Sequence, residues 1–499
     1  MRVLKNWSKW MATAACGAVL TCGMMIQAER EIIAAPTSGR LTGGPPQSAT
    51  DASDGVYLRT ILLRPKSAEQ SLRTTLFPSR HLQQPGSAAP IFLRQNFEAT
   101  HSLTVLRETY ARKDWEASLD DLDVKAIRAG TPLRWSELRR AAFRERAGWE
   151  YPIQEERMAY ILLPDVQESR IYLKAILLAA RADLKESKIN EATDKICIAM
   201  GLARHIGETP FAVCRVSQHV QVGWALQVIE ELLQHPQSEN QFWALNALPR
   251  PMIAVQDAVQ LESHNLARTF PMLAASDARL TEEDWKKVAG EVLRLLAESG
   301  AAFPKEETPE AQRKMREWID KSRERLPRVR PDWKDRVATM SDAEVGVRYW
   351  FERTQARTTR HLALATLEYP QALKLLAEDE VRLNKDSEDE SPLRQTEFRV
   401  LPLVRAAALT DQRIGLLRTI EAIRDWSAAH KGELPPALSD LRLPVPLDCV
   451  TQAPFTYTID AARKTATLEG APIVIENRQA DGRSTLMRRG FRYELVVGE

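Results

Sequence analysis

The chain has 499 residues, of which 44% are hydrophobic and 27% are charged. This composition supplies enough apolar residues for a large core and excludes a wholly disordered protein. The formal net charge is +2, which is too small to indicate a basic surface for nucleic acid, so we expect no nucleic-acid partner. A chain of this length typically forms about two to four domains.

The chain begins with the three parts of an export signal. Basic residues precede an uncharged run over residues 11–26, and Ala28 supplies a small residue at the expected cleavage position. This order predicts a secretory signal peptide over residues 1–28. The uncharged run has 16 residues, fewer than the roughly 18 or more of a membrane-spanning helix. We therefore expect cleavage, and a membrane anchor retained through residues 11–26 is the alternative.

Export would place the protein in the periplasm or the cell envelope. Cleavage would also remove Arg2, Lys5 and Lys9, which lowers the basic count from 69 to 66 against 67 acidic residues and makes the net charge −1. A body so close to neutrality argues against a highly charged ligand that is steered over long distances.

Residues 29–89 are expected to form a flexible linker and a poorly ordered segment. Residues 34–55 are rich in Gly, Pro, Ser, Thr and Ala, and residues 78–90 contain QQPGSAAP. Such compositions are typical of linkers. Residues 56–63 (VYLRTILL) interrupt this region, and their pattern fits either a short strand or a helix.

A helical-hairpin domain is predicted over residues 90–399. Apolar residues recur three and four positions apart over residues 173–184, 192–206, 222–233 and 285–295. This spacing places the apolar side chains in one stripe along an α-helix, and the stripe must be buried against a partner. The domain is therefore expected to consist mainly of packed amphipathic helices.

Helix boundary signals separate these segments. Glu208-Thr209-Pro210 divides the second segment from the third, and Thr281 with the acidic residues after it opens the fourth. Short loops between long amphipathic helices produce antiparallel hairpins. Small and apolar residues lie where paired helices would approach closely, at Ile176, Ala179, Ala180, Ala192, Ile196 and Ala199.

These positions resemble those of a tetratricopeptide hairpin. The match does not recur at a period of about 34 residues, which a tetratricopeptide array would show. We therefore predict one tetratricopeptide-like hairpin in a solenoid-like body. A charge run over residues 378–392 follows later in the domain, and we interpret it as a solvated loop. Its carboxylates lack the Gly and the terminal Glu of a calcium loop.

Residues 400–499 are predicted to form a small α+β module. A helix through Leu416 and Ile420 to about His430 ends at a Gly- and Pro-containing stop over residues 431–436. Three segments rich in Thr, Tyr and Val then suit β-strands. They are residues 455–460 (FTYTID), 464–469 (KTATLE) and 491–497 (FRYELVV).

Several runs resemble a group of uncharacterised exported proteins of planctomycete bacteria. They are WEYPIQEERMAYILLPDVQESR (149–170), GLARHIGETP (201–210), NQFWALNALPRPMI (240–253) and the tail over residues 419–460. That group has no assigned activity, so the resemblance implies export and no further function.

The tail also resembles the C-terminal half of type II secretion major pseudopilins, which have a helix, a Gly-x-x-Pro stop and an Asp-Pro turn into strands. The corresponding residues here are DWSAAHKGELPPALSDL and PLDCVTQAPFTYTID. Cys449 stands where the family has proline after Asp448, and the methylated N-terminal helix of a pilin is absent. The resemblance implies a module, and it leaves open whether that module binds calcium.

No motif typical of catalysis or cofactor binding is present in the sequence. It contains no GxSxG elbow, HExxH helix, P-loop or GxGxxG turn. We therefore predict no catalytic, cofactor-binding or metal-ligating residue. His205 and His219 form the most interesting histidine pair, because a hairpin can bring their helices together. Our interpretation is that they lie at helix ends or on solvated faces.

Cysteine, aspartate and tryptophan clusters have plain structural interpretations. Cys197 and Cys214 can form one disulfide, but with Cys449 they fit buried thiols better. Asp120, Asp121 and Asp123 suit glycoside chemistry less well than a helix start. The tryptophans at 285, 318, 333 and 350 fit core anchors better than a ligand groove.

One corner motif has two interpretations. Asn240-Gln241-Phe242-Trp243 and Leu248-Pro249-Arg250-Pro251 predict a compact helix–loop–helix corner. The Pro-Arg-Pro turn either presents Arg250 to a partner or only sets the angle between the helices. We favour the second interpretation.

Three hypotheses for the function follow from the sequence. The favoured one is an exported helical scaffold that binds a protein or peptide partner, because stacked hairpins leave a concave face. The alternatives are an envelope hydrolase with an unrecognised active site and a structural protein tethered by its N-terminal helix. The sequence indicates no cofactor and does not define the oligomeric state.

Overall fold

The computed structural model describes residues 56–68, 74–98, 115, 117–153, 161, 163–275, 280–298, 309–385, 399–460, 462, 464–478 and 484–498. Within these residues the protein is mainly helical, with a small sheet region near the C-terminus, as predicted. The expected signal peptide over residues 1–28 and the linker composition over residues 34–55 lie outside the described residues. None of the described helices is long and apolar enough to cross a membrane.

Three long helices carry the first three predicted apolar stripes. They are α7 (Pro164–Lys185), α8 (Ile189–Gly207) and α9 (Ala212–Gln234). The loops between them are short, which makes consecutive helices antiparallel. Helix α9 packs against α7 as well as against α8. The three helices therefore form one compact group.

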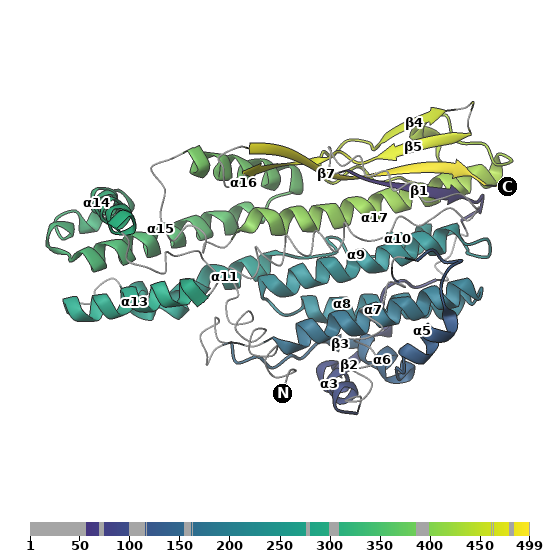
Figure 1. The fold of residues 1–499 in the computed structure, drawn as a ribbon. Helices are drawn as coiled ribbons and strands as arrows, with labels where there is room; N and C mark the ends of the chain where they lie inside the picture. Colours follow the sequence, from purple (N-terminus) through teal and green to yellow (C-terminus); the bar gives the residue numbers. More distant parts are fainter. Residues whose placement is uncertain are drawn as a thin grey trace.

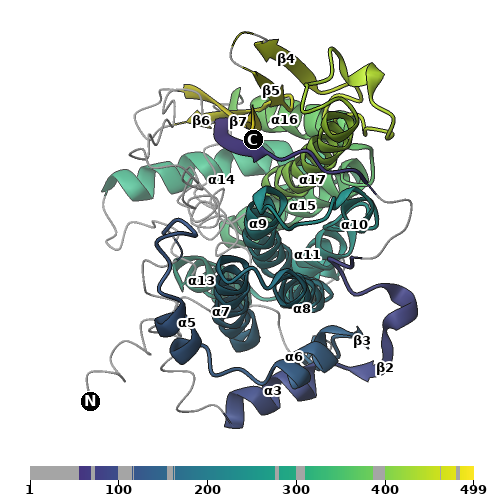
Figure 2. The ribbon, with the colours of Figure 1, turned by 90° about the vertical axis from the view of Figure 1, so that its right-hand side faces the viewer.

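The buried centre of the molecule consists of α9 and α17 (Val400–Ala429), which contact each other. Figure 2, a view along the long axis, shows α17 between α9 and the sheet. Helix α9 is buried around almost its whole circumference, so the single stripe predicted over residues 222–233 is too narrow. The reason is that α7, α8, α17 and strand β1 all pack against it.

A helical arm extends from this centre, at the end opposite to the C-terminus in Figure 1. It consists of α11 (Gln256–Thr269), α13 (Glu282–Glu298), α14 (Pro309–Val329) and α15 (Asp342–Leu364). Thr281 and Asp284 cap α13 with reciprocal hydrogen bonds, as its sequence predicts. The arm has two small hydrophobic cores that are separate from the main core.

The sheet near the C-terminus has the strand order β1-β7-β5-β4. Strand β7 (Ser484–Val497) pairs in parallel with β1 (Val56–Leu63) and antiparallel with β5 (Thr465–Glu469). Strand β4 (Thr456–Asp460) forms the other edge, and β6 (Ile473–Arg478) pairs with the first half of β7. Three of these strands were predicted, whereas β6 was not.

The pairing of β1 corrects the expectation that residues 29–89 are linker and poorly ordered throughout. Residues 56–63 are a strand, with Ile61 and Leu63 fully buried. Their partner strand lies more than 400 residues later in the chain, so no local pattern could reveal the pairing. Residues 84–87 also form a short strand, β2 (Gln84–Ser87), which pairs with β3 (Arg144–Arg146).

The predicted boundary at residues 399 and 400 coincides with the start of α17. Nevertheless one continuous hydrophobic core includes Leu177, Leu416 and Leu495, which lie on both sides of that boundary. The remaining elements are α3 (Ala89–Glu98), α5 (Val124–Gly130), α6 (Trp135–Ala142), α10 (Phe242–Asn246), α12 (Pro271–Ala274), α16 (Tyr369–Lys385) and short 3-10 turns at Arg80–Leu82, Pro331–Trp333, Val337–Thr339 and Leu438–Asp440.

Helix α16 corrects part of the prediction for the charge run. The run over residues 378–392 was expected to be a solvated loop, but residues 378–385 are the last turns of α16. Asp379 is buried there and bonds Arg360 and Arg382. These ion pairs allow an acidic sequence to remain helical. Residues 386–392 lie outside the described part of the chain.

Candidate functional site

The two histidines that the sequence singles out have separate partners. The ring of His205 contacts the carbonyl oxygen of Ala141 through Nε2 at 3.0 Å. The ring of His219 contacts the hydroxyl of Thr410 through Nδ1 at 2.6 Å. Burial, with a smaller effect of nearby Arg413, lowers the pKa of His219 to about 4. Both rings are buried, which corrects the expectation of helix ends or solvated faces for His219 in particular.

The cysteines and the aspartate cluster have the structural roles that we favoured. Cys197 and Cys214 are free and buried, and burial raises the pKa of each thiol to about 12. Asp123 caps α5 by accepting a hydrogen bond from the Ala126 N–H at 2.9 Å. Asp121 accepts a bond from the Ser118 hydroxyl in the preceding turn. These groups therefore do not converge on one site.

The tryptophans of the arm are core residues, as predicted. Trp285, Trp333 and Trp350 are buried, and Trp318 packs partly buried beside them. The guanidinium of Arg348 lies 4.7 Å from the ring centres of both Trp285 and Trp333. The aromatic rings therefore enclose a cation of the same chain, instead of lining a groove.

In the turn after Asp448, N–H groups of the chain bind the carboxylate. Asp448 is buried, and its carboxylate accepts hydrogen bonds from Gln412 Nε2 and from the N–H groups of Val450 and Ala471. N–H donors therefore occupy the carboxylate where a calcium ion would need lone pairs. Among the described residues, no group of three or more His, Cys, Asp or Glu side chains could hold a metal ion.

A shallow depression lies between α3, α7 and α8. Phe92, Trp149 and Tyr172 line it together with Asp165 and Ser169. Its free volume of about 20 Å³ holds about one water molecule. The Tyr151 hydroxyl donates to Asp165, and Gln221 donates to Ser169. The depression therefore has little room for a ligand.

Buried ion pairs hold the sheet to the central helices. Glu230 of α9 is fully buried and accepts hydrogen bonds from Arg413 at 2.9 Å and from the Tyr493 hydroxyl at 2.6 Å. Arg59 of β1 lies 3.1 Å from the same carboxylate. This one acidic group thus connects α9, α17, β1 and β7. Two arginines and a tyrosine of the same chain surround this carboxylate, which is typical of a structural network.

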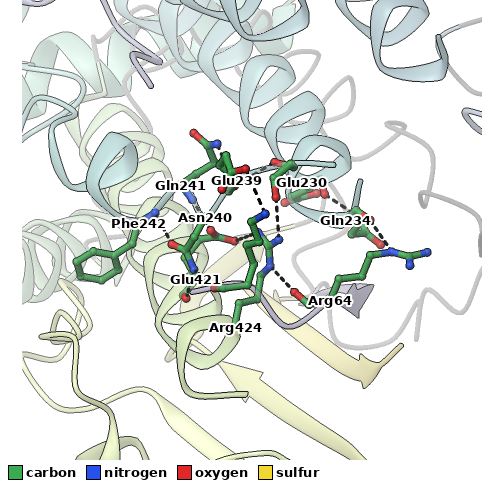
Figure 3. Close-up of polar contacts among 11 residues, drawn as sticks. Arg64, Glu230, Gln234, Glu239, Asn240, Gln241, Phe242, Glu421 and Arg424 are labelled. Carbon is green, nitrogen blue, oxygen red and sulfur yellow. Dashed lines mark hydrogen bonds and ion pairs between the residues drawn. The ribbon is translucent and has the colours of Figure 1, made fainter. Parts of the chain in front are cut away.

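A second network fixes the corner between α9 and α10 (Figure 3). Glu421 of α17 bonds Arg424 and accepts the backbone N–H of Gln241. Asn240 donates to the Glu421 carbonyl at 2.8 Å and accepts the Phe242 N–H at 3.0 Å. Arg424 also donates to the carbonyl of Arg64, so the chain after β1 is held as well. The network therefore fixes the position of the first turn of α10 relative to α17.

The other end of α10 brings two arginines together. The Oδ1 atom of Asn246 accepts hydrogen bonds from Arg418 of α17 and from Arg250, both at 2.6 Å. The two donor nitrogens are therefore at most 5.2 Å apart, since each lies 2.6 Å from the same oxygen. Two positive charges at this separation repel each other by about 1 kcal/mol even in a water-like medium. We call Asn246, Arg250 and Arg418 the arginine corner.

Arg418 differs from six other buried arginines in its electrostatic surroundings. It is only 7% exposed, its Nε has no hydrogen-bond partner, and no ion pair with a carboxylate is present among the described residues. Its other contact is the ring of Phe242, at 5.8 Å. Six other buried arginines each lie within 4.0 Å of a carboxylate. They are Arg59, Arg181, Arg215, Arg348, Arg413 and Arg424.

Burial and the charge of Arg250 lower the pKa of Arg418 to about 10. The side chain is therefore protonated at neutral pH, and no carboxylate of the described residues forms an ion pair with it. A buried charge of this kind is costly unless a partner compensates it. Arg250 is exposed, so an anion from outside can reach its guanidinium.

Apolar residues border the arginine corner. Phe242 and Trp243 pack with Leu443 and Val445 of the loop over residues 441–447. The same loop approaches α17 one turn before Arg418, where Pro446 would lie 3.6 Å from a side chain at Gly415. On the surface of this region, Leu447 is 52% exposed, and Pro251 and Pro444 are exposed too. Phe242 connects Arg418 to these apolar residues, which we call the apolar surround.

Sequence reasoning identified only one of the three residues of the arginine corner. The Pro-Arg-Pro turn singled out Arg250, with the favoured interpretation that it sets a helix angle. Arg418 and Asn246 were missed because nothing in the sequence distinguishes them from other polar residues on helices. Neither a protein family, nor a curated protein, nor a solved structure matches the chain.

Proposed function

We propose that the chain is an exported helical scaffold that binds a protein or peptide segment in the cell envelope, and that the arginine corner is its contact site. The observation that carries this proposal is the charge of Arg418, which is buried without a carboxylate partner among the described residues. An anionic group on a partner would compensate that charge.

The apolar surround supports a peptide rather than a free inorganic ion. A peptide that places an acidic group between the two guanidiniums can bury apolar side chains against Pro251, Pro444 and Leu447. Burying apolar area provides affinity, and the charged contact provides orientation. The same proposal includes four features that the sequence patterns given above predict. They are export, a tetratricopeptide-like hairpin, a solenoid-like body and a pseudopilin-like tail.

A selection from random displayed dodecapeptides against the purified chain without residues 1–28 tests the proposal. We expect the selected peptides to share an acidic residue next to apolar residues. Arg250→Gln and Arg418→Gln should each weaken the binding of these peptides about tenfold or more, because each removes a charge-assisted hydrogen bond. Fluorescence anisotropy of labelled peptides measures the affinity.

Arg316→Gln provides a matched control, since Arg316 is an exposed arginine on α14, in the arm. This variant should bind the selected peptides as the unmodified chain does. Equal binding by all three variants would contradict the proposed contact site. A selection that enriches no common motif would contradict the binding function itself.

A further inference from the structure

The arginine corner holds two positive charges on one shared acceptor. The guanidiniums of Arg250 and Arg418 both donate to the Oδ1 atom of Asn246. An amide oxygen is neutral, so these hydrogen bonds orient the two guanidiniums without neutralising them. Among the described residues, neither arginine forms an ion pair with a carboxylate. Because Arg418 is only 7% exposed, its surroundings are less polar than water, which strengthens every interaction of its charge.

The carboxyl of Asp411 does not remove this excess of positive charge. It accepts hydrogen bonds from the Met252 N–H and from the Tyr369 hydroxyl, both at 2.9 Å, and forms no ion pair with an arginine of the described residues. Even if Asp411 is counted as ionised, two positive charges and one negative charge leave an excess of +1. The corner therefore attracts a dianion more strongly than a monoanion.

The two guanidiniums also offer more N–H groups than one carboxylate can accept. Each guanidinium has five N–H donors, and the Nε atom of Arg418 is buried without a hydrogen-bond partner. One carboxylate can pair with the edge of one guanidinium, and the charge of the other guanidinium then remains unpaired. A phosphorylated side chain, or two neighbouring carboxylates, supplies oxygen atoms and negative charge to both.

We propose that the arginine corner takes a doubly charged anionic group, which accepts hydrogen bonds from Arg250 and from Arg418. This inference rests on the proposed function, because it names the charge of the peptide group that the corner binds. Two neighbouring Asp or Glu side chains and a phosphorylated side chain are its two sources. The corner recognises the same double charge in either case.

Anion titrations of the chain without residues 1–28 test the inference. The probes are acetate, malonate and inorganic phosphate at pH 8 and at one constant, low ionic strength, where acetate is a monoanion and the other two are mainly dianions. The readout is the arginine Nε–H resonances in a nitrogen–proton NMR spectrum, assigned with Arg250→Gln and Arg418→Gln. We expect malonate and phosphate to bind about tenfold or more tightly than acetate, because their second charge meets the second guanidinium.

The variant Asn246→Asp tests whether the double positive charge is the cause. It keeps an oxygen for both guanidiniums but adds one negative charge between them, so malonate and phosphate should each bind about tenfold or more weakly. Asn190→Asp is the matched control, because Asn190 is an exposed asparagine on α8, and it should leave all three affinities unchanged. If Asn246→Asp does not fold, Arg250→Gln lowers the charge of the corner by the same amount at an exposed position.

Peptides distinguish the two sources of the double charge. A selected peptide with two neighbouring acidic residues is compared with a form in which one of them is an amide and with a form that carries one phosphoserine in their place. Tighter binding by the selected peptide identifies paired carboxylates, and tighter binding by the phosphoserine form identifies a phosphorylated side chain. Equal binding by the form with a single carboxylate would overturn the inference.

The failures of the two proposals are distinguishable. If acetate binds as tightly as malonate and phosphate, and Asn246→Asp leaves the affinities unchanged, the inference fails, whereas selected peptides that still need Arg250 and Arg418 would keep the proposed function. If no anion shifts the arginine resonances and peptide binding is indifferent to both arginines, both proposals fail.

Discussion

Two arginines on α17 are both buried, but their surroundings differ completely. Arg424 bonds Glu421 and donates to the carbonyl of Arg64, so its charge is compensated within the chain. Arg418 donates to a neutral amide and lies near a second positive charge. The free energy of unfolding should therefore respond differently when each side chain is replaced by an apolar one of similar length.

Arg424→Met should lower the free energy of unfolding by about 3–5 kcal/mol, because Glu421 would remain buried and unpaired. Arg418→Met should leave it unchanged or raise it by about 1–3 kcal/mol, because the variant removes a buried charge that has no carboxylate partner among the described residues. Urea unfolding at pH 7 gives the free energy of unfolding of both variants. The buffer is a cationic base with chloride as its anion. A loss of stability in Arg418→Met comparable with that in Arg424→Met would show that Arg418 has an internal partner.

Glu262 of α11 predicts a stability that depends on pH. Burial raises the pKa of this carboxyl to about 7, and its bonds to the Ala212 N–H at 3.4 Å and to Asn265 at 3.5 Å are too long to offset this. The folded-state pKa lies above the unfolded value of 4.5. Ionisation in the folded state is thus a cost that is present above about pH 7 and disappears as the pH falls towards 4.5.

Glu262→Gln should therefore raise the free energy of unfolding by about 1–3 kcal/mol at pH 8 and by almost nothing at pH 4.5. Urea unfolding of the variant and the unmodified chain at the two pH values gives the difference, which cancels the titration of all other groups. A difference that does not change with pH would contradict the raised pKa.

At the scale of elements, β1 is the strand whose role the sequence predicted least well. Its residues alternate between a buried face, with Arg59, Ile61 and Leu63, and a partly exposed face that includes Thr60. The buried face lies over α9, where Arg59 meets Glu230. Substitutions on the two faces are therefore expected to change the free energy of unfolding by different amounts, whereas substitutions in a linker would show no such difference.

Ile61→Ala should lower the free energy of unfolding by about 2–4 kcal/mol, because the side chain is fully buried in the main core. Thr60→Ala, on the other face, removes only one long hydrogen bond to Glu494 and should cost less than about 1 kcal/mol. Urea unfolding measures both values. Equal, small effects would indicate that residues 56–63 do not belong to the sheet.

The elements that the sequence predicted correctly are those whose signals are local. The stripes over residues 173–184, 192–206 and 285–295 reappear in α7, α8 and α13, and the strands over residues 455–460 and 464–469 reappear in β4 and β5. Asp123 and Thr281 cap helices as their positions suggest. In each case neighbouring residues supply the signal, so no knowledge of distant contacts is required.

The features that the sequence could not reveal depend on distant partners. Residues 378–385 remain helical because Arg360 pairs with Asp379, and a charge run alone does not show this. The arginine corner joins Asn246, Arg250 and Arg418 from α10, a loop and α17. Arg418 differs from Arg424 only in what lies beside it. An uncompensated charge is a property of the packed molecule and cannot be read from residue type.

At the scale of the whole molecule, the main core and the two cores of the arm lie along an elongated shape (Figure 1). The main core extends from β1 through α7, α8 and α9 to α17 and the sheet. Two smaller cores stabilise the arm, where Trp285 and Trp333 belong to different clusters and are connected through Arg348. Local opening of the arm should therefore cost less than opening of the centre, because fewer apolar groups hold it.

The parallel pairing of β1 with β7 has a consequence for the order in which the protein can fold. Thr60 and Glu494 are neighbours in the sheet although 434 positions separate them in the chain. During synthesis, β1 emerges first and its partner emerges last, so the sheet can close only when nearly the whole chain is available. Until then β1 can pack against α9 but lacks its partner strand. A chaperone that shields this strand would thus act on the nascent protein for almost the entire duration of translation.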